Sequence, residues 1–174
     1  MAKPKFMWWK FIAVWIGFLL LHFSYKTFPG LFFKIVAEDH EATFFHMKML
    51  FVSYSLVSLV ELWLRRKAIA SKSAFLYSRA LLAVAFPWLT ITLWFTAEAL
   101  GIQLPVTPWE LIYANVLTAL GIYLVLRLEE VLDGVQFRPS LKALVVALYL
   151  AAVLSYVSFS LNVPVHFFTT PPEF

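Results

Sequence analysis

Five long apolar runs, separated by short polar stretches, set the pattern of this sequence. Each run is close to or above the roughly 20 residues that an α-helix needs to cross the hydrocarbon core of a bilayer. The pattern predicts an all-α fold: a polytopic integral membrane protein with a single five-helix transmembrane domain over residues 1–174. The predicted helices lie at about 6–25, 43–64, 75–100, 109–126 and 140–162.

Lys3, Lys5 and Lys10 precede or enter the first run, which gives it the basic start of a signal peptide. No small-residue cleavage site comes after it, so we interpret it as a retained anchor. The stretch 27–36 contains Pro29-Gly30 and is too short to span, so we expect an interfacial loop or a short re-entrant piece. Ser140 is the expected N-cap of the last helix.

A proline interrupts the third predicted helix. Pro87 has no N–H group, so the carbonyl of Ala83 loses its usual donor and a kink is expected. We expect Thr90, Thr92 or neighbouring helices to supply replacement hydrogen bonds.

Composition agrees with the membrane class and excludes several kinds of chemistry. Hydrophobic residues make up 62% of the 174 positions and charged residues 14%, against about half and a quarter in soluble domains. The chain has no cysteine, which excludes disulfides, thiolate metal ligands and cysteine nucleophiles. The net charge of +4 is not gathered in a dense basic patch, so we expect no nucleic-acid partner.

Lysine and arginine are distributed unevenly between the two sides of the predicted bundle. Of the 14, all but three fall on the side of the amino terminus; the other side receives Lys26, Lys34 and Lys48. By the positive-inside rule, this predicts a multi-pass plasma-membrane protein with the amino terminus cytoplasmic and the carboxyl terminus outside.

Small residues repeat every four positions in the last predicted helix, at Ala143, Ala147, Ala151 and Ser155. This spacing lets transmembrane helices approach closely. We expect the stripe to serve packing, and the Ala143/Ala147/Ala151 face is a candidate for self-association.

The residues with chemical potential concentrate in the stretch 38–48, which holds three carboxylates, two imidazoles and an ammonium. With helical spacing, its members and the following turns form two neighbouring stripes: Asp39, His46 and Ser53, and Glu41, Lys48 and Ser55. Capping by Asp39 and the helix dipole are the structural alternative for the acids. Because Lys48 lies more than a turn inside the helix, we expect it to pair with Glu41.

The predicted orientation brings all four histidines to the outer side. We predict a ligand-binding site formed by His22, Glu41, His46 and Lys48. The same residue types match the ligands of a divalent ion such as zinc, with His22, Glu41, His46 and His166 as candidates, although the His-Glu-x-x-His spacing is absent. A neutral imidazole bonded to a nearby carbonyl or hydroxyl is the structural alternative for His22 and His46.

Another group of charged residues lies at the inner ends of the predicted helices. We expect these residues to form solvated pairs at the membrane boundary: Glu61, Arg127, Glu129, Glu130 and Asp133.

Three segments together resemble a known family: Leu20-Leu21-His22-Phe23-Ser24-Tyr25, His40 to Met49, and Phe159-Ser160-Leu161-Asn162-Val163-Pro164. They are similar to an uncharacterised prokaryotic family of small five-helix membrane proteins with an Asn-Glu-Ser-x-Trp-Glu-His-x-Lys motif before the second helix. Glu41, His46 and Lys48 match that motif. His40, Ala42, Phe44 and Phe45 stand where the motif has Asn, Ser, Trp and its second Glu. The resemblance implies no activity.

Two functions are therefore expected. The first is a non-catalytic role, as a small subunit of a membrane complex or as a protein that binds a lipid or small ligand at the outer polar site. The alternative is a metal-dependent membrane enzyme that uses His22, Glu41 and His46 as ligands of a divalent ion.

Overall fold

A computed structural model describes residues 7–37, 43–101 and 107–162, and over these ranges the chain is built of helices with no strand. Five of the helices are long and apolar enough to cross a membrane, and α2 is a short helix between the first two of them. The helices are α1 (Trp8–Thr27), α2 (Leu31–Val36), α3 (Thr43–Arg65), α4 (Lys72–Ala99), α5 (Thr107–Leu132) and α6 (Pro139–Leu161).

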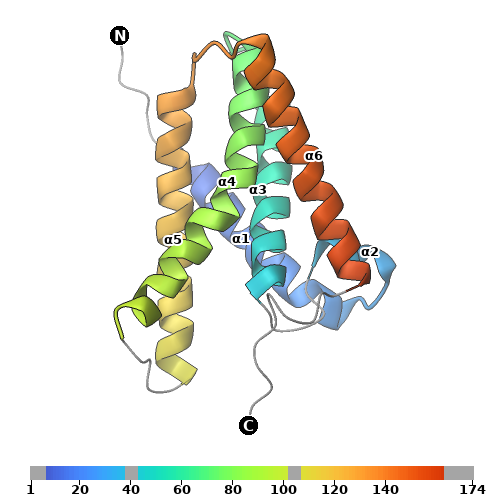
Figure 1. The fold of residues 1–174 in the computed structure, drawn as a ribbon, viewed down its shortest axis with the longest axis vertical. Helices are drawn as coiled ribbons and strands as arrows, with labels where there is room; N and C mark the ends of the chain where they lie inside the picture. The colour runs from blue at the N-terminus through green and yellow to red at the C-terminus, as the bar shows by residue number, and fades with distance from the viewer. Residues whose placement is uncertain (1–6, 38–42, 102–106, 163–174) are drawn as a thin grey trace.

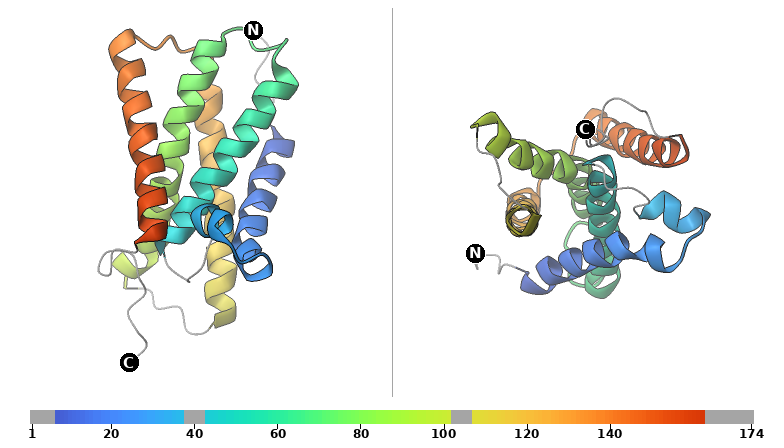
Figure 2. Two further views of the ribbon diagram at one scale, coloured as in Figure 1. Left: turned by 90° about the vertical axis from the view of Figure 1, so that its right-hand side faces the viewer. Right: turned by 90° about the horizontal axis from the view of Figure 1, so that it is seen from below.

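The long helices run up and down beside one another (Figure 1). Helices α1, α3, α4 and α5 contact each other in a closed ring, and α6 packs on the outer side of α4. The short α2 lies across one end of the bundle against α1, α3 and α6 (Figure 2). We call this end, where α1 and α6 finish and α3 begins, the α2 end, and the other end the inner end, after the sequence-based orientation.

Aromatic and aliphatic side chains of α3 form the centre of the core. Phe45, Met49 and Tyr54 are fully buried, and Phe86 of α4 and Ile122 of α5 pack into the same cluster. Gly121 lets α4 and α5 approach closely, because a Cβ atom at this position would lie 2.4 Å from the Thr90 hydroxyl oxygen.

Helix α4 changes direction along its length (Figure 1), and it contains Pro87. The expected replacement hydrogen bonds to the Ala83 carbonyl are not made by the two threonines. Thr90 donates to the carbonyl of Phe86 at 3.1 Å and Thr92 to that of Trp88 at 2.7 Å. Both hydroxyls therefore bond four residues back on their own helix, which is the nearest acceptor that a helical threonine reaches.

Several helix ends differ from those expected from the apolar runs. Helix α5 continues past residue 126 to Leu132, and Gly134 follows it with φ +88°, a left-handed conformation that suits a helix end. Helix α6 starts at Pro139 with Arg138 as N-cap, so Ser140 is not its cap; proline fits the first turn because no donor is needed there. Residues 31–36 are helical rather than a loop.

The small-residue stripe of α6 does not pack inside the chain. Ala143, Ala147, Ala151 and Ser155 are all exposed, whereas the bundle is contacted by the opposite face of α6, which includes Val145, Tyr149 and Tyr156. The rings of Tyr149 and Tyr156 pack against Phe51 of α3, with ring centres 5.1 and 5.2 Å apart.

Large apolar side chains cover much of the outer surface of the long helices. Leu154 is 68% exposed and Leu111 65%, and tryptophans are exposed near both ends of the bundle: Trp8, Trp63 and Trp109. Such a surface is unfavourable in water and suits a lipid environment with aromatic residues at its boundaries.

Candidate functional site

Two histidines predicted for the outer site lie side by side at the α2 end. The ring centres of His22, near the end of α1, and His46, in the first turn of α3, are 5.5 Å apart with the rings inclined by 38°. Phe18, one turn before His22, lies 6.2 Å from both rings and stacks on His22. His22 and His46, 24 positions apart in the sequence, thus form one imidazole pair that packs against the Phe18 ring.

Lys48 is the buried cation of the same end. Its side chain is fully buried, and its Nζ donates to the backbone carbonyl of Lys34 and to the Ser160 hydroxyl, each at 2.9 Å. The ammonium also lies 4.5 Å from the centre of the Phe45 ring, a cation–π contact. Lys48 therefore links α2, α3 and α6. The predicted partner, Glu41, lies outside the described residues, as do Asp39 and His166.

The two predicted stripes of α3 face different helices. His46 meets His22 of α1, and Ser53 lies against Gly17 of α1. The other stripe faces α6: Lys48 bonds to Ser160, and the Ser55 hydroxyl accepts from Tyr149 at 3.2 Å. Helical spacing alone separated these stripes correctly, but it did not indicate which neighbour each one contacts.

No group of three metal-binding side chains occurs among the described residues. The spacing of the two histidine rings is nevertheless suitable for a shared metal ion. When two imidazole nitrogens bind one tetrahedral zinc ion at about 2.1 Å each, the ring centres lie roughly 5 Å apart. A third protein ligand would have to come from Glu41 or His166, the two other candidates, which are outside the described part of the chain.

A second ionic cluster, at the inner end, is buried far more deeply than expected. The Lys10 ammonium of α1 lies 2.5 Å from carboxylate oxygens of both Glu61 on α3 and Glu129 on α5, and all three side chains are at most 1% exposed. The expectation of solvated boundary pairs is therefore wrong for Glu61 and Glu129. It is wrong because their partners come from other helices, 51 and 119 positions away in the sequence.

Further cations and a hydroxyl complete the inner cluster. The Arg79 side chain of α4, 4% exposed, binds the Asp133 carboxylate at 2.7 Å and lies within 3.5 Å of Glu61 and Glu129. Arg65 binds Glu61 at 2.6 Å, and the Tyr54 hydroxyl donates to Glu129 at 2.5 Å. Three basic and three acidic side chains are thus joined, so the cluster is electrically balanced, as a buried group of charges requires.

The remaining inner pair behaves as expected. Arg127 binds Glu130 at 2.6 Å, one turn apart on α5, and the Arg127 side chain is 51% exposed. This is a solvated boundary pair. One sequence signal could have indicated the buried cluster: Lys10, Glu61 and Arg79 each lie inside or beside an apolar run, and charges of both signs share this end of the bundle.

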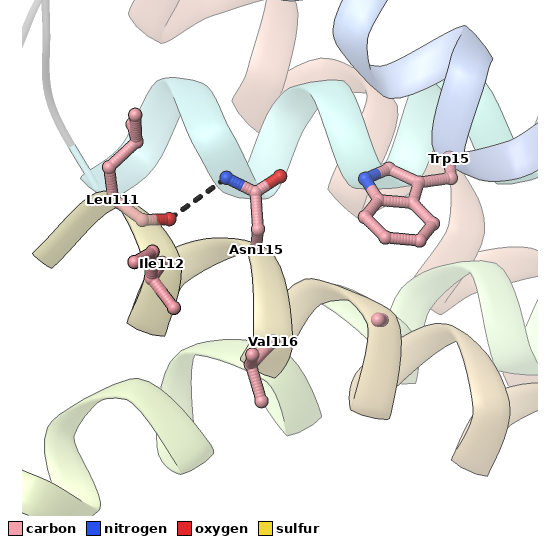
Figure 3. Close-up of a pocket in the computed structure, with 6 residues that line it drawn as sticks. Trp15, Leu111, Ile112, Asn115 and Val116 are labelled. Atoms are coloured by element: carbon pink, nitrogen blue, oxygen red, sulfur yellow. Dashed lines mark hydrogen bonds between the residues drawn. The ribbon is translucent and has the colours of Figure 1, made fainter. Parts of the chain in front are cut away.

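A groove of about 430 Å³ lies on the side of the bundle between α1 and α5 (Figure 3). Its walls are apolar apart from Trp15 and Asn115, and the Asn115 amide donates to the Leu111 carbonyl of its own helix at 2.9 Å. None of the predicted site residues lines this groove.

Comparisons of the chain with protein-family models, with curated proteins and with solved structures gave no match. The family resemblance drawn from the sequence segments therefore stays a prediction, and the function has to be argued from the two ionisable clusters.

Proposed function

We propose that this chain is a multi-pass protein of the plasma membrane, with a cytoplasmic amino terminus, that binds a lipid or small-molecule head group at its outer face without transforming it. One observation carries the proposal: His22 and His46 lie 5.5 Å apart at the end of the bundle where Lys48 is buried. An imidazole nitrogen can donate or accept a hydrogen bond, so two imidazoles side by side suit a polar head group.

Ionisable side chains inside a membrane bundle cost free energy, so they usually mark a position with a structural or functional role. Lys48 has a structural role, because it holds α2 and α6 to α3. The histidine pair differs from Lys48 because it brings together two titratable rings from separate helices, α1 and α3. A ligand that bridges them would also fasten α1 to α3.

The test is to purify the protein in a mild detergent and identify bound small molecules by native mass spectrometry. We expect a ligand that is present in the wild type and in Phe23→Ala but lost in His46→Phe, which keeps an aromatic ring at that position. Phe23 is a suitable control because its ring is 4.9 Å from His22 and 56% exposed. An identical set of bound molecules in all three proteins would overturn the proposal.

A metal-dependent membrane enzyme is the second candidate, favoured by the zinc-like spacing of the two rings. In this function His22 and His46 hold a divalent ion with Glu41. Elemental analysis of the purified protein separates the two functions. Stoichiometric metal that is lost in His46→Ala supports the enzyme, and a folded wild type without metal after growth in zinc- and iron-supplemented medium contradicts it.

We also propose that the exposed face of α6 that carries Ala143, Ala147 and Ala151 associates with a second copy or with another membrane subunit. The natural absence of cysteine makes a direct test simple. In membranes treated with a mild oxidant such as copper phenanthroline, Ala147→Cys should form disulfide-linked dimers. Leu148→Cys, which is exposed at 41% and lies about 100° further around the helix, should not. Equal cross-linking at both positions would argue against a specific face.

A further inference from the structure

A second groove lies between α3 and α6, with α4 as its floor, in the half of the bundle near the inner end. Helices α3 and α6 come together near the α2 end and diverge toward the inner end (Figure 2). The groove has a volume of about 400 Å³, within the range of small-ligand sites. Its walls include Leu59 and Leu62 of α3 and Val146 and Leu150 of α6, a surface suited to an acyl chain.

Two buried polar groups of residues that line this groove have no hydrogen-bond partner in the described part of the chain. They are the hydroxyl of Ser58, a residue 6% exposed, and the Nε–H of Arg79, which is 4% exposed. Buried donors are nearly always paired in folded proteins, so an unpaired donor beside a cavity points to an acceptor that binds there.

The charges around the groove favour an anionic acceptor. Tyr77 also lines the groove, and the Lys142 ammonium of α6 lies 5.2 Å from the centre of its ring. Lys142 forms no ion pair with any of the residues that the structure describes. Arg79 is bound by Asp133 at 2.7 Å and lies within 3.5 Å of Glu61 and Glu129, so its charge is balanced within the inner cluster. The positive charge that is left for an anionic ligand at this groove is that of Lys142.

We propose that this groove binds an anionic phospholipid from the bilayer leaflet at the inner end. The phosphate accepts hydrogen bonds from the Arg79 Nε–H and the Ser58 hydroxyl, Lys142 interacts with the head-group charge, and one acyl chain lies along Leu59, Leu62 and Leu150. The inference rests on the proposed membrane insertion but not on the histidine pair, which is at the other end of the bundle.

The experiment measures lipid binding to the delipidated full-length protein in detergent by native mass spectrometry. The probes are phosphatidylglycerol, phosphatidylcholine with the same acyl chains, and inorganic phosphate. Ala80 is half-buried and lines the groove, so Ala80→Leu should fill it. Ala85→Leu is the matched control, because Ala85 is on the same helix, exposed and outside the groove.

We expect one phosphatidylglycerol per chain, bound several-fold more tightly than phosphatidylcholine. Ala80→Leu should lose this binding and Ala85→Leu should keep it. Ser58→Ala, which leaves the volume of the groove nearly unchanged, should weaken it about tenfold, the usual effect of losing a hydrogen bond to a charged group.

Three results would overturn the proposal. The first is equal affinity for the two lipids, since the groove would then not recognise charge. The second is equal binding by the two alanine variants, which would locate the lipid elsewhere. The third is binding of inorganic phosphate without any phospholipid. A negative result for the phospholipid groove would not contradict the proposed ligand site at the histidine pair, because His46→Phe tests that site separately.

Discussion

The ammonium of Lys10 lies 2.5 Å from a carboxylate oxygen of Glu129, although 119 positions separate the two residues. Lys10 is in the first turn of α1 and Glu129 in the last turn of α5. The contact joins the first and the fourth long helices and closes the ring of α1, α3, α4 and α5.

Lys10→Met should strongly destabilise the protein. It leaves Glu61 and Glu129 buried with one cation fewer, and breaking a buried ion pair typically costs about 3–5 kcal/mol. Thermal unfolding in detergent, followed by circular dichroism, measures the effect. The double variant with Glu129→Gln removes one charge of each sign and should recover part of the loss. Lys67→Met, at an exposed position of the same end, should unfold like the wild type. A neutral effect of Lys10→Met would contradict the buried cluster.

Tyr54→Phe tests the hydroxyl of the cluster without changing the core packing. The ring stays against Phe86, but Glu129 loses a donor, and a hydrogen bond to a charged group contributes about 1.5–3 kcal/mol. Tyr149→Phe removes a neutral bond to Ser55 and should cost less, about 0.5–1.5 kcal/mol. Chemical unfolding of both variants gives the comparison. The opposite order of stabilities would show that the Tyr54 hydroxyl does not contribute as described.

Gly121→Ala should destabilise the contact between α4 and α5. The added methyl group would meet the Thr90 hydroxyl at 2.4 Å, and relieving that overlap requires Thr90 to give up its bond to Phe86 or the helices to separate. Overpacking of this kind costs about 1–3 kcal/mol.

Gly17→Ala is the matched control for Gly121→Ala. It also replaces a helical glycine, but its methyl group would make an ordinary contact of 3.4 Å with Ser53. Alanine favours the helix, so this variant should be as stable as the wild type or more stable. Equal melting temperatures of the two variants would contradict the close approach at Gly121.

Ser160→Ala should loosen α2. Lys48 would keep its bond to the Lys34 carbonyl but lose the one to α6. Hydrogen exchange of the backbone amides of residues 31–37 should become several-fold faster. Ser155→Ala changes an exposed serine of the same helix and should leave that exchange unchanged. Unaltered exchange in both variants would mean that α2 is held by its apolar contacts alone.

The number and the alternating direction of the long helices followed from the sequence because both depend on local properties. A membrane helix is specified by about 20 successive apolar residues, and the basic residues that flank it lie next to it in the chain. The position of Lys48 more than a turn inside its helix likewise indicated that it needs a partner, for which we expected Glu41. Its observed partners are Lys34 of α2, 14 positions away, and Ser160 of α6, 112 positions away, and the pattern of α3 alone indicates neither.

The inner cluster could not be derived in the same way. Glu129 fell beyond the apolar run that ended the predicted helix at residue 126, so it was expected in a solvated segment. In the structure α5 continues to Leu132 and turns Glu129 toward Lys10 and Tyr54. Which helix is beside which is a property of the whole bundle, and the pattern along one helix does not determine it. The same reason applies to the small-residue stripe of α6: its spacing is visible in the sequence, but whether it faces the bundle or the outside depends on how α6 packs.

The balance of the inner cluster has a consequence for how the chain is made. As synthesis proceeds, α1, α3 and α4 bring Lys10, Arg65 and Arg79 against a single carboxylate, that of Glu61. Glu129 and Asp133 arrive only with α5 and its end. Without α5, two of these three positive charges would have no carboxylate in the cluster. We therefore expect the first helices to reach their final packing only after α5 has been added.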